Sequence, residues 1–193
     1  PVRALVATYN DWLRQQGAVD YAAMVSWPLH LIQRRPELLR RLREDYQAIL
    51  CDEAQDCSAL QYRTLERLAA GHRNLMLVAD PNQAIYAWRG ADHTVLRRFA
   101  ADFPEHRAMP LARNFRSSGR IVAFANALGA LLGSATALWT HHPPGDPVRL
   151  YVADDEDDEI AFVVAEIHRL LRQGYVSSAG EIAVLTRVHR HQM

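Results

Sequence analysis

Residues 48–53 read AILCDE, and residues 75–83 read LMLVADPNQ. Short apolar runs that end in turn-forming or acidic residues are typical of buried strands in a parallel sheet. We therefore expect strands over 47–51 and 74–79, with Asp52 and Glu53 beyond the first and Gln83 shortly after the second. Ligands of α/β proteins bind beyond the carboxyl ends of the strands. These two runs thus indicate both the fold class and the place of a site.

Helical patterns flank the two runs. Apolar residues at helical spacing predict helices over 2–16, 58–70, 94–102, 118–132 and 160–173, and the segment 20–46 is expected to be helical with breaks at Pro28 and Pro36. Ser58 and Gln61 are expected to form a capping box at the start of the helix over 58–70, and the acidic run 154–159 is expected to cap the last helix. Further strands are expected near 107–112, 148–152 and 182–185. This alternation predicts an α/β chain with mostly parallel sheets.

The composition excludes several classes of protein. Hydrophobic residues make up 49% of the 193 residues and charged residues 23%, with a formal net charge of zero. These proportions are typical of a globular protein and not of a disordered chain, a collagen or a disulfide scaffold. No apolar run approaches the roughly 20 residues that a membrane helix needs. Cys51 and Cys57 are expected to be free thiols of a reducing compartment, so we expect a cytoplasmic protein with no membrane partner.

The chain contains no lysine, because all 22 of its basic residues are arginine. A phosphate-binding P-loop needs a lysine that reaches the β- and γ-phosphates. These residues therefore hold no P-loop. The first residue is Pro1 and not methionine, so we expect a piece of a longer protein. If that protein is a P-loop machine, its phosphate cradle lies outside this chain.

Asp52 and Glu53 follow directly on the first expected strand. Adjacent acids at a strand end point in different directions, so they can divide two tasks. One can hold Mg²⁺ through its water shell. The other can orient and deprotonate an attacking water. A solvated turn after a strand has the same pattern, so this signal is weak by itself.

The segment after the second expected strand combines an amide, two aromatic rings and an arginine. Gln83 lies where it could sense a phosphate or a water. Tyr86 and Trp88, beside Arg89, suit the stacking of single-stranded bases. Taken alone, both rings could also be core residues.

A third polar stretch, residues 113–118, reads RNFRSS. Arg116 lies just before the expected start of a helix, where an arginine can reach a phosphate that is bound to a neighbouring domain. Phe115 could stack on a nucleobase. A surface arginine beside a capping serine is the alternative.

Together the three stretches form a specific series. DEAQD at 52–56, DPNQAIYAWRGA at 80–91 and NFRSS at 114–118 resemble motifs II, III and IV of the superfamily 1 DNA helicases of the UvrD/Rep/PcrA type, in the same order. Residues 19–21, residues 138–140 and the strands expected at 148–152 and 182–187 are similar to further parts of that family. Ala79 stands where glycine is common, and Phe115 replaces the usual tyrosine.

The resemblance implies a fold and a domain organisation. The fold would be the RecA-like P-loop NTPase motor fold with mostly parallel sheets, present as a partial two-domain fragment. Residues 1–112 would be the C-terminal part of the first motor domain, with motifs II and III. Residues 113–193 would begin the second motor domain, from motif IV onward. The family's P-loop and its motifs V and VI are absent from these residues, so we expect the fragment alone to be inactive.

The resemblance also implies residue roles, with ATP and Mg²⁺ as cofactors. The implied catalytic residues are Glu53, which activates the water, Gln83, which senses the γ-phosphate, and Arg116, which binds it from across the cleft. Nucleotide and metal binding are implied for Asp52 (Mg²⁺), Gln83, Phe115 (stacked on adenine) and Arg116. Contacts with single-stranded DNA are implied for Tyr86, Trp88 and Arg89.

The implied activity of the parent protein is that of an ATP-dependent DNA helicase in DNA repair. It would couple ATP hydrolysis to 3′–5′ translocation on single strands and to unwinding at duplex junctions, in contact with the remaining motor segments of its own polypeptide. Two alternatives remain open. One is a non-catalytic DNA-binding or interaction module that retains the motor fold, and the other is the motor part of a helicase–nuclease of the RecB/AddA type.

Overall fold

The structure is a computed structural model that describes residues 2–134 and 136–187. Its α-helices are α1 (Val2–Gln15), α2 (Tyr21–Arg34), α3 (Pro36–Asp45), α4 (Ala59–Ala69), α5 (Val95–Asp102), α6 (Gly119–Leu131) and α7 (Glu156–Arg172). Its strands are β1 (Ile49–Cys51), β2 (Leu75–Leu77), β3 (Arg113–Asn114) and β4 (Trp139–Thr140). Single 3₁₀ turns lie at η1 (Ala54–Asp56), η2 (Pro81–Gln83), η3 (Ala87–Arg89) and η4 (Ala179–Glu181). The chain is thus a mixed α/β protein with short strands.

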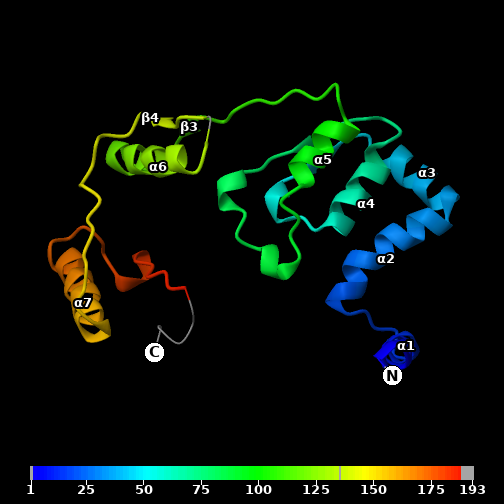
Figure 1. Ribbon diagram of the computed structural model, residues 1–193, viewed down its shortest axis with the longest axis horizontal. Coiled ribbons are helices and arrows are strands. Elements are labelled where there is room, and N and C mark those ends of the chain that lie inside the picture. The colour runs from blue at the N-terminus through cyan, green and yellow to red at the C-terminus, as the bar shows by residue number, and fades with distance from the viewer. Residues whose placement is uncertain (1, 135, 188–193) are drawn as a thin grey trace.

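The strands form two parallel pairs. β1 pairs with β2 so that Ile49, Leu50 and Cys51 lie beside Leu75, Met76 and Leu77. β3 pairs with β4, with Arg113 beside Trp139 and Asn114 beside Thr140. Figure 1 shows α6 lying along the second pair and a long connection, without helix or strand, between α5 and β3. The parallel arrangement agrees with the expected α/β fold.

The apolar core lies mainly in the part of the chain before residue 104. Helix α4 contacts α2, α3, α5 and β2. Tyr62 of α4 and Val95 of α5 are almost fully enclosed. The Tyr62 hydroxyl donates a 2.7 Å hydrogen bond to Asp102 Oδ2, and burial together with this bond raises the pKa of Tyr62 well above its ordinary value. The remaining buried apolar residues of this part are Leu13, Ala23, Leu29, Ile32, Ala54, Ala69 and Phe103.

Side-chain caps begin three of the helices, as the sequence predicts for two of them. Ser58 and Gln61 form a reciprocal capping box at α4. Asp155 caps α7 by accepting a bond from the Asp158 amide, within the acidic run. Asp20 caps α2 in the same way through the Ala23 amide. Pro28 lies inside α2 without ending it, so the expected break at Pro28 is wrong, whereas Pro36 does begin a new helix.

Three expected strands are not present as strands in the described residues. Residues 107–112, 148–152 and 182–185 have no regular structure, and Leu150 and Leu185 are more than nine-tenths exposed. A strand exists only through a ladder of hydrogen bonds to a neighbour. Among the described residues, the backbone bonds of these three segments to another segment are limited to one, from the Trp139 amide to the Ala112 carbonyl. β1 and β2 are also shorter than expected. They are covered on one face only, since Leu50 and Met76 are exposed.

The part after residue 109 is held together by local hydrogen bonds. The Asn126 side chain of α6 donates to the Leu138 carbonyl and accepts from its amide, both at 2.8 Å. The Gly119 and Arg120 amides, at the start of α6, donate to the carbonyls of Pro143 and Pro144. Tyr151 stacks on Phe162 of α7 with ring centroids 4.0 Å apart. Within residues 2–134 and 136–187, no helix is long and apolar enough to cross a lipid bilayer.

Candidate functional site

The carboxyl ends of β1 and β2 bring two polar loops to one edge of the sheet. The Val78 amide donates to the Cys51 carbonyl at 2.8 Å, and the Ala54 amide donates to the Val78 carbonyl at 2.9 Å. These bonds continue the pairing of the strands past their ends. Residues 52–56 and 78–83 therefore lie side by side, as the sequence predicts.

Glu53 occupies an unusual backbone conformation. Its φ of 50° and ψ of 42° lie in the left-handed region, which costs a residue with a side chain about 1 kcal/mol. The conformation reverses the chain after Asp52, whose Oδ1 accepts from the Glu53 amide at 3.0 Å. Both carboxylates are exposed at the sheet edge. Backbone strain of this kind concentrates at functional sites.

The amide of Gln55 links the two loops. Its Nε2 donates to Glu53 Oε2 at 2.7 Å, and its Oε1 accepts from the Asp80 amide at 3.1 Å. Gln55 is only 4% exposed. The sequence patterns did not single out this residue. The sequence did contain one signal for it, since Gln55 is an amide placed between acidic residues shortly after the end of a strand.

Asp80 organises the second loop. Its carboxylate accepts from the Asn82 amide at 2.9 Å and from Gln83 Nε2 at 2.7 Å. Pro81 stands at the first position of η2, where proline fits a helical turn. The Gln83 side chain is thereby turned back toward the end of β2. Asp80 is a second residue whose part in the site the sequence patterns did not indicate.

Two cavities open at this edge. One of about 480 Å³ is lined by Glu53, Gln55, Asp56, Asn82, Gln83, Ile85 and Tyr86. The other, of about 920 Å³, is lined on one side by Asp52, Glu53 and Gln83 and on the other by residues of the connection and of α6, including Arg107 and Asn126. Asp52, Glu53 and Gln83 thus face one cavity, as expected. The smaller cavity is thus lined both by the acids Glu53 and Asp56 and by Tyr86, the first aromatic residue after η2.

Tyr86, Trp88 and Arg89 form one cluster. The two rings lie 6.4 Å apart at an angle of 53°, and the Arg89 guanidinium lies 5.1 Å from the Tyr86 centroid and 4.6 Å from that of Trp88. Trp88 is 74% exposed. Of the two possibilities that the sequence left open for this ring, a place in the core is therefore wrong for Trp88. Exposed aromatic faces beside a cation are the groups on which bases stack.

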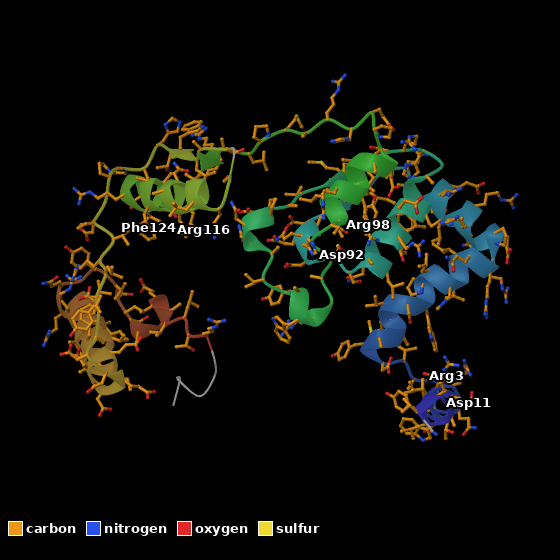
Figure 2. The ribbon with its side chains drawn as sticks, in the orientation of Figure 1. Arg3, Asp11, Asp92, Arg98, Arg116 and Phe124 are labelled. Carbon is orange, nitrogen blue, oxygen red and sulfur yellow. The ribbon has the colours of Figure 1, made fainter. Side chains whose placement is uncertain are left out.

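The far end of this loop is fastened to α5 and to the first loop. The Asp92 amide donates to the Cys57 carbonyl at 2.9 Å, and Ala91 pairs with Ser58 in an antiparallel bridge. The Asp92 carboxylate accepts from Thr94 and forms a 3.0 Å ion pair with Arg98, the residue shown beside it in Figure 2. These donors, Thr94 first, hold the pKa of Asp92 below its ordinary value.

Phe115 and Arg116 lie outside both cavities. Phe115 is 70% exposed, and the Arg113 guanidinium lies over its ring at 4.4 Å and over Trp139 at 5.2 Å. Arg116 is exposed, and Figure 2 places it with the α6 segment. The structure therefore brings together Asp52, Glu53, Gln83 and Tyr86, but not Phe115 or Arg116.

The acidic donors suit Mg²⁺ only together with other ligands. No three His, Cys, Asp or Glu side chains converge on one point within the described ranges. Mg²⁺ is usually held by one or two carboxylates, with phosphates and water completing its shell. Asp52 provides such a carboxylate. Asp56 Oδ1, nearby, is buried and has no hydrogen-bond partner, so the edge retains unused acceptor capacity.

The two cysteines lie at the end of β1 and directly after η1, and they are free thiols, as expected. Their sulfur atoms are 3.7 Å apart. Burial, together with the neighbouring Cys51, raises the pKa of Cys57 to about 12. The Cys57 thiol is therefore protonated at neutral pH, and neither cysteine belongs to a cluster of metal-ligating side chains within the described ranges.

Comparison with protein-family models gives two matches that together span nearly the whole chain. Residues 1–104 match the UvrD/REP helicase N-terminal domain. Residues 109–193 match the UvrD-like helicase C-terminal domain.

Curated proteins with similar sequences are DNA helicases. DNA helicase II of Escherichia coli strain K12 is 36% identical over 183 residues, which cover 93% of this chain and 25% of that protein. DNA helicase II of Haemophilus influenzae is 35% identical, over 93% of this chain and 24% of its own. ATP-dependent DNA helicase PcrA of Staphylococcus epidermidis is 34% identical, over 94% and 25%. The chain thus spans about a quarter of the length of the curated relatives it matches.

Proposed function

The chain belongs to the UvrD/REP helicase family, and from that premise we propose that it is part of an ATP-dependent DNA helicase. The parent protein couples ATP hydrolysis to translocation along single-stranded DNA, in the 3′–5′ direction, and to unwinding at duplex junctions. The similar proteins are named DNA helicase II and ATP-dependent DNA helicase PcrA, which supports this assignment.

We further propose that the two parts of the chain belong to two RecA-like motor domains. Residues 1–112 contribute the β1–β2 edge with motifs II and III, and residues 113–193 begin the second domain at motif IV. The parallel pairing within each part supports this division, because RecA-like domains are built on parallel sheets. The remaining motor segments of the parent protein complete both sheets.

One observation carries the proposal. Asp52, Glu53 and Gln83 come from two separate strands and line a single cavity of about 920 Å³. Glu53, Gln83 and Tyr86 line the adjoining cavity of about 480 Å³. A group that senses a phosphate and a group that meets DNA therefore lie on the same loop. Such an arrangement allows the state of one ligand to affect the binding of the other.

Each residue of the nucleotide site then has a distinct task. Mg²⁺, when bound with the phosphates, neutralises the charge that develops during phosphoryl transfer. Asp52 holds the metal, and Glu53 orients a water and accepts its proton. Gln83 contacts the γ-phosphate. Phe115 stacks on the adenine, and Arg116 reaches the γ-phosphate when the second domain closes onto the first.

The DNA site is the cluster of Tyr86, Trp88 and Arg89. Trp88 offers an open ring face to a base, and stacking on an aromatic ring contributes roughly 1–3 kcal/mol per base. Arg89 adds positive charge beside the strand. Because only three residues separate η2 from η3, movement of this cluster when it binds DNA acts on Gln83.

The replacement Glu53→Gln in the full-length parent protein tests the proposal. It keeps the size of the side chain but removes the base, so we expect DNA-stimulated ATP hydrolysis to fall at least about 10²-fold while nucleotide binding persists. Steady-state hydrolysis and equilibrium binding of a fluorescent ATP analogue measure the two effects. Glu44→Gln, on the exposed face of α3, is the matched control and should leave both unchanged.

The isolated 193-residue chain gives a further check in the same assay. It has no lysine for a phosphate cradle, so we expect no measurable hydrolysis from it. Full activity of the Glu53→Gln parent protein, or hydrolysis by the isolated chain, would contradict the proposed division of roles.

A further inference from the structure

Apart from Tyr62 with its hydroxyl, Gln55 is the one residue with a polar side chain that is buried within the described parts of the chain. It lies in η1, between the acids at the end of β1 and the start of the loop after β2. A buried amide costs free energy unless its donor and its acceptor are both satisfied. At this position both are, and the partners belong to the two different loops of the site.

The partners fix the orientation of the amide. The Asp80 backbone amide can only donate, so the atom facing it, at 3.1 Å, is the Gln55 oxygen. The Gln55 nitrogen therefore faces Glu53 Oε2, at 2.7 Å. A bond from an amide to an ionised carboxylate is charge-assisted, and burial of the donor strengthens it. This bond restricts the rotation of the Glu53 carboxylate.

The connection continues beyond Asp80. The Asp80 carboxylate accepts from Gln83 Nε2 at 2.7 Å. A single path thus runs from Glu53 through Gln55 and the Asp80 residue to Gln83. A displacement of the loop that carries Gln83 moves the Asp80 amide, and with it the Gln55 side chain that holds Glu53.

We propose that Gln55 is a positioning residue that sets the orientation of the Glu53 carboxylate according to the position of the Gln83 loop. The proposal rests on the proposed function, in which Glu53 is the base. The side-chain bonds of Gln55 go to Glu53 and Asp80, and Gln55 acts through these two residues. The loop also carries Tyr86 and Trp88, so DNA on those rings alters the geometry of the base through Gln55.

Two substitutions at this position separate the two bonds. Gln55→Met retains the length of the side chain but removes both bonds. Gln55→Glu retains an acceptor for the Asp80 amide but places a carboxylate against Glu53. Gln61→Glu is the matched control, since it makes the same chemical change six residues further on and a glutamate keeps the capping box of α4.

Hydrolysis by the full-length parent protein, with and without single-stranded DNA, is the measurement. We expect kcat to fall about 10²-fold in Gln55→Glu and about 10-fold or more in Gln55→Met, with the KM for ATP within about twofold of the original value. The ratio of DNA-stimulated to basal hydrolysis should fall in Gln55→Met. Gln61→Glu should match the unaltered protein.

A double variant tests the coupling to the loop. If Gln55 and Gln83 act through one path, the double variant with Gln55→Met and Gln83→Ala should retain as much stimulation of hydrolysis by DNA as the more damaging single variant. Independent, multiplicative losses would overturn the proposal. A merely structural glutamine would show such independent losses.

The possible failures can be told apart. Near-normal kcat in both Gln55 variants, in a parent protein that Glu53→Gln inactivates, would overturn this inference and leave the proposed function in place. A parent protein without DNA-stimulated hydrolysis would overturn both. Should Gln55→Glu bind no nucleotide because it fails to fold, Gln55→Met decides, since it introduces no charge.

Discussion

The parts of the chain before residue 104 and after residue 109 differ in how their site residues are held. Among the described residues, every buried apolar side chain except Val122 lies in the first part. There, Glu53, Gln55, Asp80 and Gln83 are joined by hydrogen bonds across two strand ends. In the second part Phe115 and Arg116 are exposed.

This difference separates two kinds of site residue. The acids and Gln83 are positioned by the fold around them, so the first part presents its share of the proposed site without help from the second. Phe115 and Arg116 are positioned by a two-residue strand and one helix. Their place in a nucleotide site depends on how the second part meets the first, so they are the parts of the proposed site that domain movement can bring in or withdraw.

The largest expected effect concerns the two cores. Tyr62→Ala removes an almost fully buried ring beside α2 and α5, so the free energy of unfolding should fall by about 3–5 kcal/mol. Val122→Ala removes a smaller side chain from α6 and should cost about 1–2 kcal/mol. Urea unfolding of the 193-residue chain, followed by circular dichroism, measures both. Tyr62→Phe isolates the bond to Asp102 and should cost about 1 kcal/mol.

Equal losses of unfolding free energy in Tyr62→Ala and Val122→Ala would contradict this difference between the two parts, because they would mean that both parts are equally well packed.

The next effect concerns the exposed aromatic residues of the two parts. Trp88→Ala should weaken the binding of single-stranded DNA by the full-length parent protein by about 5- to 150-fold, which is the loss of one stacked base. Phe115→Ala should leave DNA affinity unchanged and raise the KM for ATP instead. Fluorescence anisotropy with a labelled oligonucleotide checks the first result, and steady-state kinetics the second.

Trp12→Ala is the control for the loss of an exposed ring, because Trp12 is 53% exposed on α1, away from both sites. A loss of DNA affinity in Phe115→Ala that equals the loss in Trp88→Ala would contradict the assignment of the two rings to different ligands.

The smallest expected effect is on the stability of the fold at acid pH. Arg73 donates to Glu105 and lowers the pKa of that carboxyl to about 2, whereas Arg169 and Arg149 lower the pKa of Glu166 in the second part. A carboxyl with a lowered folded-state pKa stabilises the fold above its ordinary pKa of about 4.5, and this contribution disappears as the pH falls from there toward 2. The Arg73–Glu105 pair is exposed and Glu166 is partly exposed, so the effect should be small and weaker in salt.

Glu105→Gln should therefore reduce the loss of stability between pH 4.5 and 2, and Glu166→Gln should do the same for the second part. Thermal unfolding across this range measures the slopes. An unchanged slope in Glu105→Gln would show that the Arg73 pair contributes nothing to acid sensitivity.

The sequence predicted those features that depend on neighbouring residues. The Ser58–Gln61 capping box and the Asp155 cap are local patterns, and they appear as expected. The meeting of Glu53 with Gln83 could be predicted because parallel strands end at a common edge. The strands expected at 148–152 and 182–185 could not be judged in this way, because a strand needs a partner that local sequence does not identify.

The bonds of Gln55 were beyond prediction for another reason. They depend on the register of β1 against β2, which sets the Asp80 amide opposite the Gln55 oxygen. A one-residue slip of that register would move Asp80 out of reach. Likewise, the segment that leads into β4 is held by Asn126, which bonds to the backbone of Leu138, a contact between residues 12 positions apart.

The left-handed backbone of Glu53 has a consequence for protein engineering. A design procedure that optimised this backbone for stability alone would place glycine at position 53, gaining about 1 kcal/mol and deleting the carboxylate. Under the role proposed for Glu53 this change would remove the base, whereas Arg73, which also has a positive φ, has no part in the proposed site. Thermostabilised versions of the parent protein should therefore leave position 53 unaltered, and gains are better sought at exposed helix positions.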